Sequence, residues 1–478
     1  MTLLRNELTL SWKRVLLVSL FVREASFYKT FFTLTLIIGL QNMITFGVNL
    51  SDNLMIGGYS ESALSGIAIA NQIQFVLQML VMGVSEGLVI MASRYWGAND
   101  IGSIKRIASI GMRLSILVGL VMWLIVFFFP QNLLSLFTND QSVISEGTKF
   151  IKIICFSYLF FSVTSILLAA LRSVETVKIG FILSSTMLII NVCLNYILIY
   201  GHFGFPSLGV QGTAIATLTA RIIELIIVCI FVKRIDRKIQ LKLRDFFTID
   251  MELFKRYVKL GSPILMSNFI WGIAMATQTS VLGHMGAAAI AANSIATTVF
   301  QIVSVVVFAS ASATTVVIGK TIGEGHMDKI KAYAKTLQML YLIIGLCTGA
   351  ALFVTKDYVL GFYTISAEAR DLALQFMTVL SITVCGTAYQ MPSLTGIVRS
   401  GGDTKFVLYN DTIFMWMIVL PASALCAFVF NLSPLVTFIC LKSDQILKCF
   451  VAIIKVNRFK WIRAFDSYSS ETKENIAL

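Results

Sequence analysis

Long apolar stretches recur along the whole chain, and they constrain its fold more than any other feature. A helix that crosses a bilayer needs about 20 predominantly apolar residues, and twelve segments of this chain meet that length. Only 13% of the residues are charged, whereas a soluble protein has about 25%. The sequence therefore predicts an all-α membrane protein with twelve transmembrane helices. They are expected at residues 30–57, 63–93, 107–129, 150–171, 179–200, 208–232, 261–283, 288–319, 333–355, 372–398, 405–430 and 434–455.

Two other membrane or helical architectures fit the sequence less well. A large soluble bundle would need polar stripes at helical spacing, yet residues 116–129 read ILVGLVMWLIVFFF. A transmembrane barrel would show alternating segments of about ten residues, and the apolar segments here are longer and not alternating.

The distribution of lysine and arginine predicts the orientation. With twelve spans, both termini and every second loop share one side of the membrane, and that side carries 29 Lys and Arg against 4 in the opposite loops. Cytoplasmic loops are the positively charged ones, so we expect both termini to be cytoplasmic. The net charge of +13, which in a soluble protein would suggest nucleic-acid binding, is explained by these loops, and we expect no nucleic-acid partner.

The chain also repeats itself at an offset of 226 residues. At this offset Gly97 corresponds to Gly323, and Lys105 corresponds to Lys331. Six spans per repeat is an even number, so the two halves enter the membrane from the same side and form a parallel repeat. We therefore predict two six-helix lobes, residues 1–240 with a cytoplasmic N-terminal segment and residues 241–478 with a cytoplasmic C-terminal tail.

Four stretches resemble the multidrug and toxic compound extrusion (MATE) family. They are QNMITFGVNLSDNLMIGG at 41–58, GAND at 97–100, NVCLNYILIYGHFGFPSLGVQGTAIAT at 191–217 and RSGGDTK at 399–405. The resemblance covers both halves and implies an antiporter that exports amphipathic, often cationic compounds and takes up Na⁺ or H⁺.

Polar residues within the predicted spans are the candidates for a coupling site, because a charge in hydrocarbon costs several kcal/mol. Asp52 lies about 8 Å from the external end of the first span, at 1.5 Å per residue. Asn195 lies at the same depth in the fifth span, with Asn191 one turn deeper, and Thr217 follows Thr213 in the sixth. One carboxylate, two amides and a hydroxyl supply oxygen donors that suit a hard cation.

The family resemblance points to the same positions, since Asp52, Asn191, Asn195 and Thr217 match the cation site in the family's N-terminal lobe. Some members carry Asp where Asn195 stands, so this chain has one carboxylate instead of two, which argues against a mechanism that needs two acids. The alternative is that the asparagines only join neighbouring helices, and that Asp52 is a cap or loop residue.

Other polar and aromatic residues inside the spans are candidates for contact with the transported compound. The repeat offset maps Asp52 onto Gln278, which carries no charge, so the two lobes are expected to differ in function. Broad aromatic faces can hold organic cations. We predict Gln72, Trp271, Gln278 and Tyr389 as substrate-lining residues.

The remaining intramembrane acids have less specific interpretations. Glu224 follows Arg221 by three residues and is expected to pair with it on the same helix face. Glu86 lies near the cytoplasmic end of the second span, either lining an inward-facing cavity or exposed at the interface. Asp411 is expected to pack against loop cations.

No motif in the sequence indicates an enzyme or bound cofactor. The string GKT at 319–321 lacks the earlier glycine of a P-loop, because Thr314 stands there, and three histidines in or near loops cannot assemble a metal or Ser-His-Asp site. We predict a monomeric antiporter of the plasma or inner membrane whose partners are small organic compounds and the lipid bilayer. The alternatives are a flippase for lipid-linked precursors, which would need a more cationic cavity than Arg113 and Arg221 supply, and an ion channel.

Overall fold

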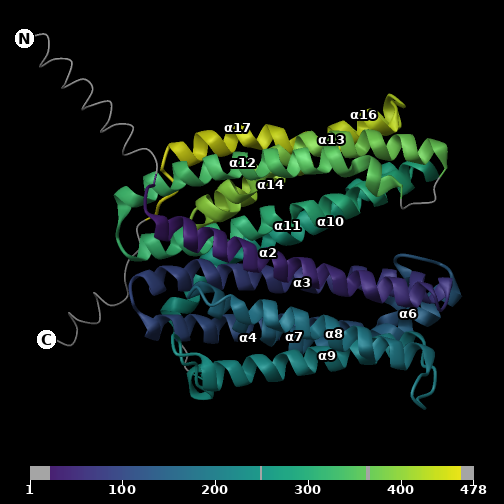
Figure 1. Cartoon of the computed structure of the whole chain (residues 1–478), viewed down its shortest axis with the longest axis horizontal. Coiled ribbons are helices and arrows are strands. Elements are labelled where there is room, and N and C mark those ends of the chain that lie inside the picture. Colours follow the sequence, from purple (N-terminus) through teal and green to yellow (C-terminus); the bar gives the residue numbers. More distant parts are fainter. Residues whose placement is uncertain (1–21, 248–249, 362–365, 464–478) are drawn as a thin grey trace, which may run out of the picture. The chain divides into compact units, whose positions relative to one another are not determined.

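A computed structural model describes residues 22–247, 250–361 and 366–463, and in these ranges the chain is helical without strands (Figure 1). The all-helical prediction is therefore confirmed. The predicted N-terminal segment and C-terminal tail lie largely outside these ranges. In the first half, the helices are α2 (Ala25–Gly57), α3 (Glu61–Gly97), α4 (Ile101–Phe128), α5 (Pro130–Ser135), α6 (Gln141–Ile154), α7 (Ser157–Ser173), α8 (Lys178–Tyr200) and α9 (Val210–Ile230).

A π-helical turn η1 (Phe231–Ile235) and a 3₁₀ segment η2 (Leu243–Phe247) connect this half to the second. The second half is interrupted more often, and its helix α13 ends just before Pro392, which cannot donate a backbone hydrogen bond. Its elements are α10 (Met251–Gly283), α11 (Ala287–Gly323), α12 (Met327–Leu360), α13 (Ala367–Met391), η3 (Pro392–Val398), α14 (Thr404–Thr412), η4 (Ile413–Val419), α15 (Leu420–Ala424), η5 (Leu425–Val429), α16 (Pro434–Lys442) and α17 (Asp444–Asn457).

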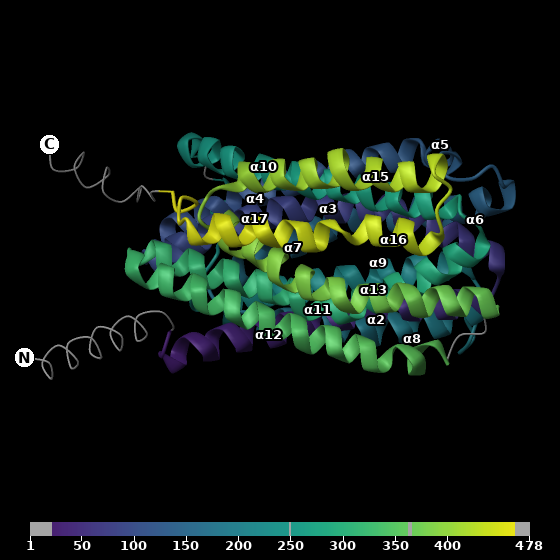
Figure 2. The same ribbon diagram turned by 90° about the horizontal axis from the view of Figure 1, so that it is seen from above.

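Ten helical segments among the described residues are long and apolar enough to cross a membrane, and the pair α6 and α7, bent by 51°, makes an eleventh. The predicted twelfth span corresponds to α16 and α17, which are separated at Ser443. Each of these two helices is too short to span the membrane alone. The apolar sequence of the predicted span is interrupted by Lys442, Asp444 and Lys448. Figure 2 shows α16 continuing beyond α17 along the same direction. The twelve-helix layout is consistent with this arrangement.

The outer faces of the helices are apolar, as a lipid environment requires. On α4, Leu117 is 55% exposed and Phe128 is 64% exposed. Contiguous exposed apolar surface of this kind marks a membrane-facing or protein-facing surface. The absence of a polar stripe in residues 116–129 is explained by this exposure.

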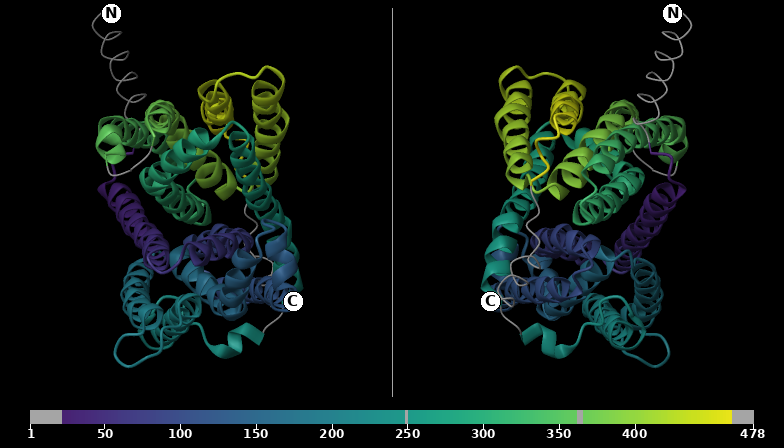
Figure 3. Two further views of the ribbon diagram at one scale, coloured as in Figure 1. Left: turned by 90° about the vertical axis from the view of Figure 1, so that its right-hand side faces the viewer. Right: turned by 90° about the vertical axis from the view of Figure 1, so that its left-hand side faces the viewer.

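The chain forms two compact units, whose boundaries fall inside α2 and α10. One unit comprises residues 37–272, and the other comprises residues 1–36 together with 273–478. Figure 3 views the helices of the units nearly end-on. The predicted lobes, 1–240 and 241–478, are defined by the sequence repeat, and that division stays a prediction.

Each unit has its own apolar core. In the unit of residues 37–272, buried side chains of α3, α6 and α9 meet, including Ile67, Ile151 and Ala214. In the other unit, Phe376 of α13 and Phe438 of α16 stack with their ring centroids 4.0 Å apart. Because α16 is held in this core, the charged residues that follow it are fixed in position.

Close helix packing in the first unit depends on glycine, and this predicts a stability effect. A Cβ atom at Gly66 of α3 would lie 2.6 Å from the backbone nitrogen of Gly147 and 2.9 Å from the carbonyl oxygen of Val143, both on α6. Backbone atoms cannot move aside cheaply, so we expect Gly66→Ala to destabilise the protein by about 1–3 kcal/mol. Thermal unfolding in detergent measures the change.

The matched control for this variant is Gly47→Ala on α2. A Cβ atom there would meet nothing within 4 Å, and alanine has the higher helix propensity. We expect no loss of thermal stability in the control, and an equal loss in both variants would contradict the packing argument.

Candidate functional site

Three helices of the unit of residues 37–272 bring the predicted coupling residues together. Asp52 comes from α2, Asn191 and Asn195 from α8, and Thr217 from α9. The α8 and α9 helices lie so close together that a Cβ atom at Gly212 would be 2.7 Å from the backbone of Leu198. Glycine at this position is what permits the close contact.

Contacts along α2 and α8 hold Asp52 opposite the asparagines. The hydroxyl of Tyr200 donates to the carbonyl oxygen of Met55 at 2.8 Å, and the hydroxyls of Thr45 and Ser184 lie 3.4 Å apart. These contacts lie on either side of Asp52 along α2, so they fix the helix in both rotation and depth.

A continuous hydrogen-bonded chain joins the four residues. The amide nitrogen of Asn195 donates to Asp52 Oδ1 at 2.5 Å and to Asn191 Oδ1 at 3.2 Å. The amide nitrogen of Asn191 then donates to Thr217 Oγ1 at 3.0 Å. Both asparagines are fully buried. The sequence-predicted residues thus form one connected polar group, whose only acid is Asp52.

This group presents one buried oxygen atom, Asn195 Oδ1, that has no hydrogen-bond partner among the described residues. Buried polar atoms without partners are rare and call for an explanation. Oxygen atoms beside a carboxylate are the ligands that a hard cation prefers, so the donor set fits a monovalent cation.

A small polar cavity lies beside Asp52 and Thr217. Its volume is about 30 Å³, which is room for a water-sized species. Besides these two residues it is lined by Thr45, Val48, Asn49, Ile67, Asn71, Gln74, Phe150, Met187 and Arg221. The sequence analysis did not select Asn71 or Gln74.

Arg221 is the other important residue that the sequence analysis did not assign to this site. It pairs with Glu224 at 2.9 Å, as predicted, but it also lines the cavity of Asp52. Its spacing was an available signal, since Arg221 follows Thr217 by four residues and so lies on the same helix face. The charged group here therefore carries one excess negative charge, since it contains two acids, Asp52 and Glu224, and one cation, Arg221.

The four predicted substrate-lining residues lie in different places. In the unit of residues 37–272, Gln72 is exposed on α3 and Trp271 is 36% exposed on α10. In the other unit, Gln278 and Tyr389 are both 5% exposed. Their role in substrate contact stays a prediction.

Glu86 lies away from the Asp52 cavity and has polar neighbours. The amide nitrogen of Asn268 on α10 donates to Glu86 Oε2 at 3.4 Å. The side chain is partly buried on α3, and its role stays a prediction.

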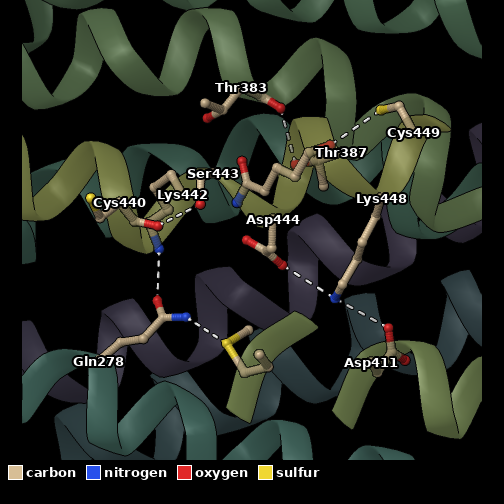
Figure 4. A network of polar contacts seen from close by, with 12 residues as sticks. Gln278, Thr383, Thr387, Asp411, Cys440, Lys442, Ser443, Asp444, Lys448 and Cys449 are labelled. Atoms are coloured by element: carbon tan, nitrogen blue, oxygen red, sulfur yellow. Dashed lines mark hydrogen bonds and ion pairs between the residues drawn. The ribbon is translucent and has the colours of Figure 1, made fainter. Parts of the chain in front are cut away.

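A second charged group occupies the unit that contains residues 273–478 (Figure 4). Lys448 of α17 contacts Asp411 and Asp444, each at 3.2 Å, so Asp411 pairs with a cation on a helix, whereas the sequence analysis expected loop cations. Arg399 lies 3.9 Å from Asp411. Lys442 donates to Gln278 Oε1 at 3.1 Å. The sequence signal for this group was the charge of Lys442, Asp444 and Lys448 inside a predicted span.

The same unit has a groove of about 620 Å³ between α12, α13 and α17. Tyr389 lies in it and donates to Gln338 Oε1 at 2.6 Å, and Asn457 donates to the same oxygen at 3.2 Å. Apolar side chains that are widely exposed, such as Ile382, form most of its wall. The groove is therefore part of the apolar outer face of this unit.

Comparison with known proteins assigns the chain to a family of transporters. Residues 38–197 and 263–425 match the family model described as MatE. The uncharacterized transporter YisQ of Bacillus subtilis is 25% identical over 403 residues, which cover 83% of this chain and 87% of YisQ. The probable multidrug resistance protein NorM of Thermotoga maritima is 22% identical over 425 residues, which cover 88% of this chain and 90% of that protein.

Solved structures share the fold at low sequence identity. An outward-facing multidrug resistance MATE transporter superposes with a TM-score of 0.80 at 18% identity, covering 89% of this chain and 95% of that one. A transporter from Pyrococcus furiosus, described as having a binding pocket of reversed polarity, gives a TM-score of 0.82 at 18% identity, covering 90% and 95%. The helical arrangement described above is therefore the arrangement of these transporters.

Proposed function

We propose that this chain, which belongs to the multidrug and toxic compound extrusion (MATE) family, is a secondary antiporter. It exports amphipathic, often cationic organic compounds in exchange for Na⁺ or H⁺. Members of this family are transporters and not enzymes. The observation that carries the proposal is the hydrogen-bonded chain from Asp52 through Asn195 and Asn191 to Thr217.

The charge of this site supports ion coupling. A carboxylate within a membrane-spanning helix is costly unless a cation or proton compensates it. Arg221 is already paired with Glu224 at 2.9 Å, so the negative charge of Asp52 is left for a mobile cation. Binding or release of that cation changes the charge within the bilayer, and a ligand that prefers one conformation shifts the equilibrium toward it.

Alternating access is the transport mechanism that suits two repeated lobes. In transporters built from parallel repeats, one lobe rocks against the other around a site near the membrane midplane. We propose that the protein acts as a monomer in the plasma or inner membrane, with both termini in the cytoplasm. Its multi-pass membrane character follows from the apolar helices.

Transport in reconstituted vesicles tests the proposal. Purified full-length protein is reconstituted, and efflux of a fluorescent cationic dye is followed under an imposed Na⁺ gradient or an imposed H⁺ gradient. We expect at least one gradient to accelerate dye movement. A rate of dye movement that is the same with and without each gradient would contradict antiport. Ion flux without dye movement would indicate a channel.

Gln278 gives a prediction about the functional difference between the halves of the chain. Gln278 is the repeat counterpart of Asp52 but is neutral, and its amide binds Lys442 and Met415. We expect Gln278→Ala to change the affinity for transported dyes, or the preference among them, by several-fold with little change in ion dependence. The dependence of efflux rate on dye concentration under each gradient measures both effects. A complete loss of ion dependence in this variant would show that coupling is not confined to the Asp52 site.

A further inference from the structure

We infer that the unit containing residues 273–478 holds a binding site for the carboxylate group of a transported compound, centred on Lys442. The inference rests on the proposed transport function and names a residue that determines the preference among transported compounds. It predicts that Lys442 contributes to the binding of compounds that carry a carboxylate.

The described residues place no carboxylate within ion-pair distance of Lys442. Its ammonium group donates one hydrogen bond, to Gln278 Oε1 at 3.1 Å, and lies 5.6 Å from the centroid of the Phe438 ring. Both of these contacts are neutral, and Asp444, the acid that acts on Lys442 from farther away, is itself paired with Lys448 at 3.2 Å. A charged residue in a membrane-spanning segment is costly and usually marks a functional site, and two N–H directions of the ammonium group remain for a ligand.

Lys448, one helical turn into α17, shows how the same unit treats a lysine that has a structural role. Lys448 is 4% exposed and contacts both Asp411 and Asp444 at 3.2 Å (Figure 4). Lys442 in contrast is partly exposed as a residue and has no carboxylate within ion-pair distance. Of these two lysines, Lys442 is therefore the one suited to bind a ligand.

The charge balance of this group selects a monoanion. It contains three cationic residues, Arg399, Lys442 and Lys448, and two acidic residues, Asp411 and Asp444. The one excess positive charge is balanced by a single carboxylate, whereas a doubly charged phosphate would leave an uncompensated negative charge. The sign is opposite to that of the group formed by Asp52, Arg221 and Glu224.

The helix is also interrupted next to Lys442. The α16 helix ends at Lys442, and α17 begins at Asp444. Interrupted membrane helices are typical of substrate and ion sites in transporters. The Phe376 and Phe438 stack anchors α16, which gives Lys442 a fixed position for binding.

A matched pair of dyes tests the inference. Tetramethylrhodamine carries a free carboxylate, and its methyl ester has the same cationic ring system without that charge. Binding of each dye to the purified full-length protein in detergent is measured by fluorescence anisotropy. We expect Lys442→Gln to weaken binding of the acid about tenfold and to change binding of the ester less than about twofold.

The control is Lys356→Gln in the same unit. Lys356 is also partly exposed, donates to the neutral Thr378 Oγ1 at 2.9 Å and lies 4.1 Å from the centroid of the Phe353 ring. Its environment resembles that of Lys442, but it is outside the charged group. We expect this control to change binding of neither dye.

Two further variants keep the test decisive if Lys442→Gln does not fold. Lys442→Arg retains the charge and is expected to retain binding of the acid. Gln278→Glu places a carboxylate beside Lys442 and is expected to weaken binding of the acid selectively, because the internal carboxylate takes its place.

Three results would overturn the inference: equal weakening of both dyes by Lys442→Gln, no weakening of either, or a wild-type protein that binds the ester and not the acid. The binding assay needs no ion gradient. A failure of gradient-driven efflux would therefore refute the antiport proposal without altering the dye comparison, and a failure of the dye comparison would leave antiport standing.

Discussion

The Asp52→Asn variant is expected to lose ion-driven efflux completely while still inserting into the membrane and binding dye. Asparagine has nearly the same shape as aspartate and keeps an oxygen that can accept from Asn195, so the hydrogen bond now 2.5 Å long can be preserved. What is lost is the only carboxylate of the hydrogen-bonded chain. We expect the efflux rate under either gradient to fall to that of vesicles without protein.

The control for this variant is Asp357→Asn, which removes an exposed acid at the far end of α12. We expect it to transport at the wild-type rate. Thermal unfolding of both variants in detergent verifies that they are folded. Transport by Asp52→Asn that still responds to an imposed gradient would show that Asp52 is not the coupling residue.

The second large effect is expected from the asparagines, and it separates Na⁺ from H⁺. Amide oxygens can coordinate a metal ion, but they are not needed to carry a proton on Asp52. We therefore expect Asn191→Ala and Asn195→Ala to reduce Na⁺-driven efflux at least about tenfold, and H⁺-driven efflux much less. Efflux rates of both variants under each gradient measure the difference.

Lowering the pH provides an independent measurement on the same site. Protonation of Asp52 removes the one negative charge among the proposed ligands, so protons and Na⁺ compete there, while Arg221 and Glu224 remain paired at 2.9 Å. We expect the stimulation by Na⁺ to diminish as the pH falls, and to diminish less in the asparagine variants because they bind Na⁺ weakly at any pH.

Asn132→Ala on the short helix α5 is the matched control for the asparagine substitutions, because Asn132 is exposed. We expect it to leave both transport modes unchanged. Equal loss of Na⁺-driven and H⁺-driven efflux in the Asn191 and Asn195 variants would mean that the asparagines serve only to join α8 to its neighbours.

The sequence alone predicted the fold class and most of the spans. In a bilayer each spanning segment must satisfy its own backbone hydrogen bonds, so the length and apolarity of each segment are local properties that can be read along the chain. Within the last predicted span, 434–455, the structure adds a break between α16 and α17, which coincides with Lys442, Asp444 and Lys448. Polar residues there reduce the apolar signal because they belong to a charged group inside the unit.

The sequence also indicated Asp52, Asn191, Asn195 and Thr217, because polar residues are rare in spans and these lie at matching depths. Depth follows from counting residues along a helix at 1.5 Å per residue. It does not give the rotation of a helix about its axis, which decides whether two side chains at one depth meet. The hydrogen bonds from Asn195 to Asp52 and from Asn191 to Thr217 show that these side chains do meet.

Only the tertiary structure decided which helices share a polar group. It placed Arg221 beside Asp52, joined Lys442 to Gln278 across 164 positions of sequence, and put the boundaries of the compact units inside α2 and α10. The pairing of side chains from different helices depends on the packing of both surfaces, including close approaches such as that of Gly212 to Leu198. Apolarity and helical period set the helices themselves, whereas the contacts that give the site its charge arise from how the helices pack.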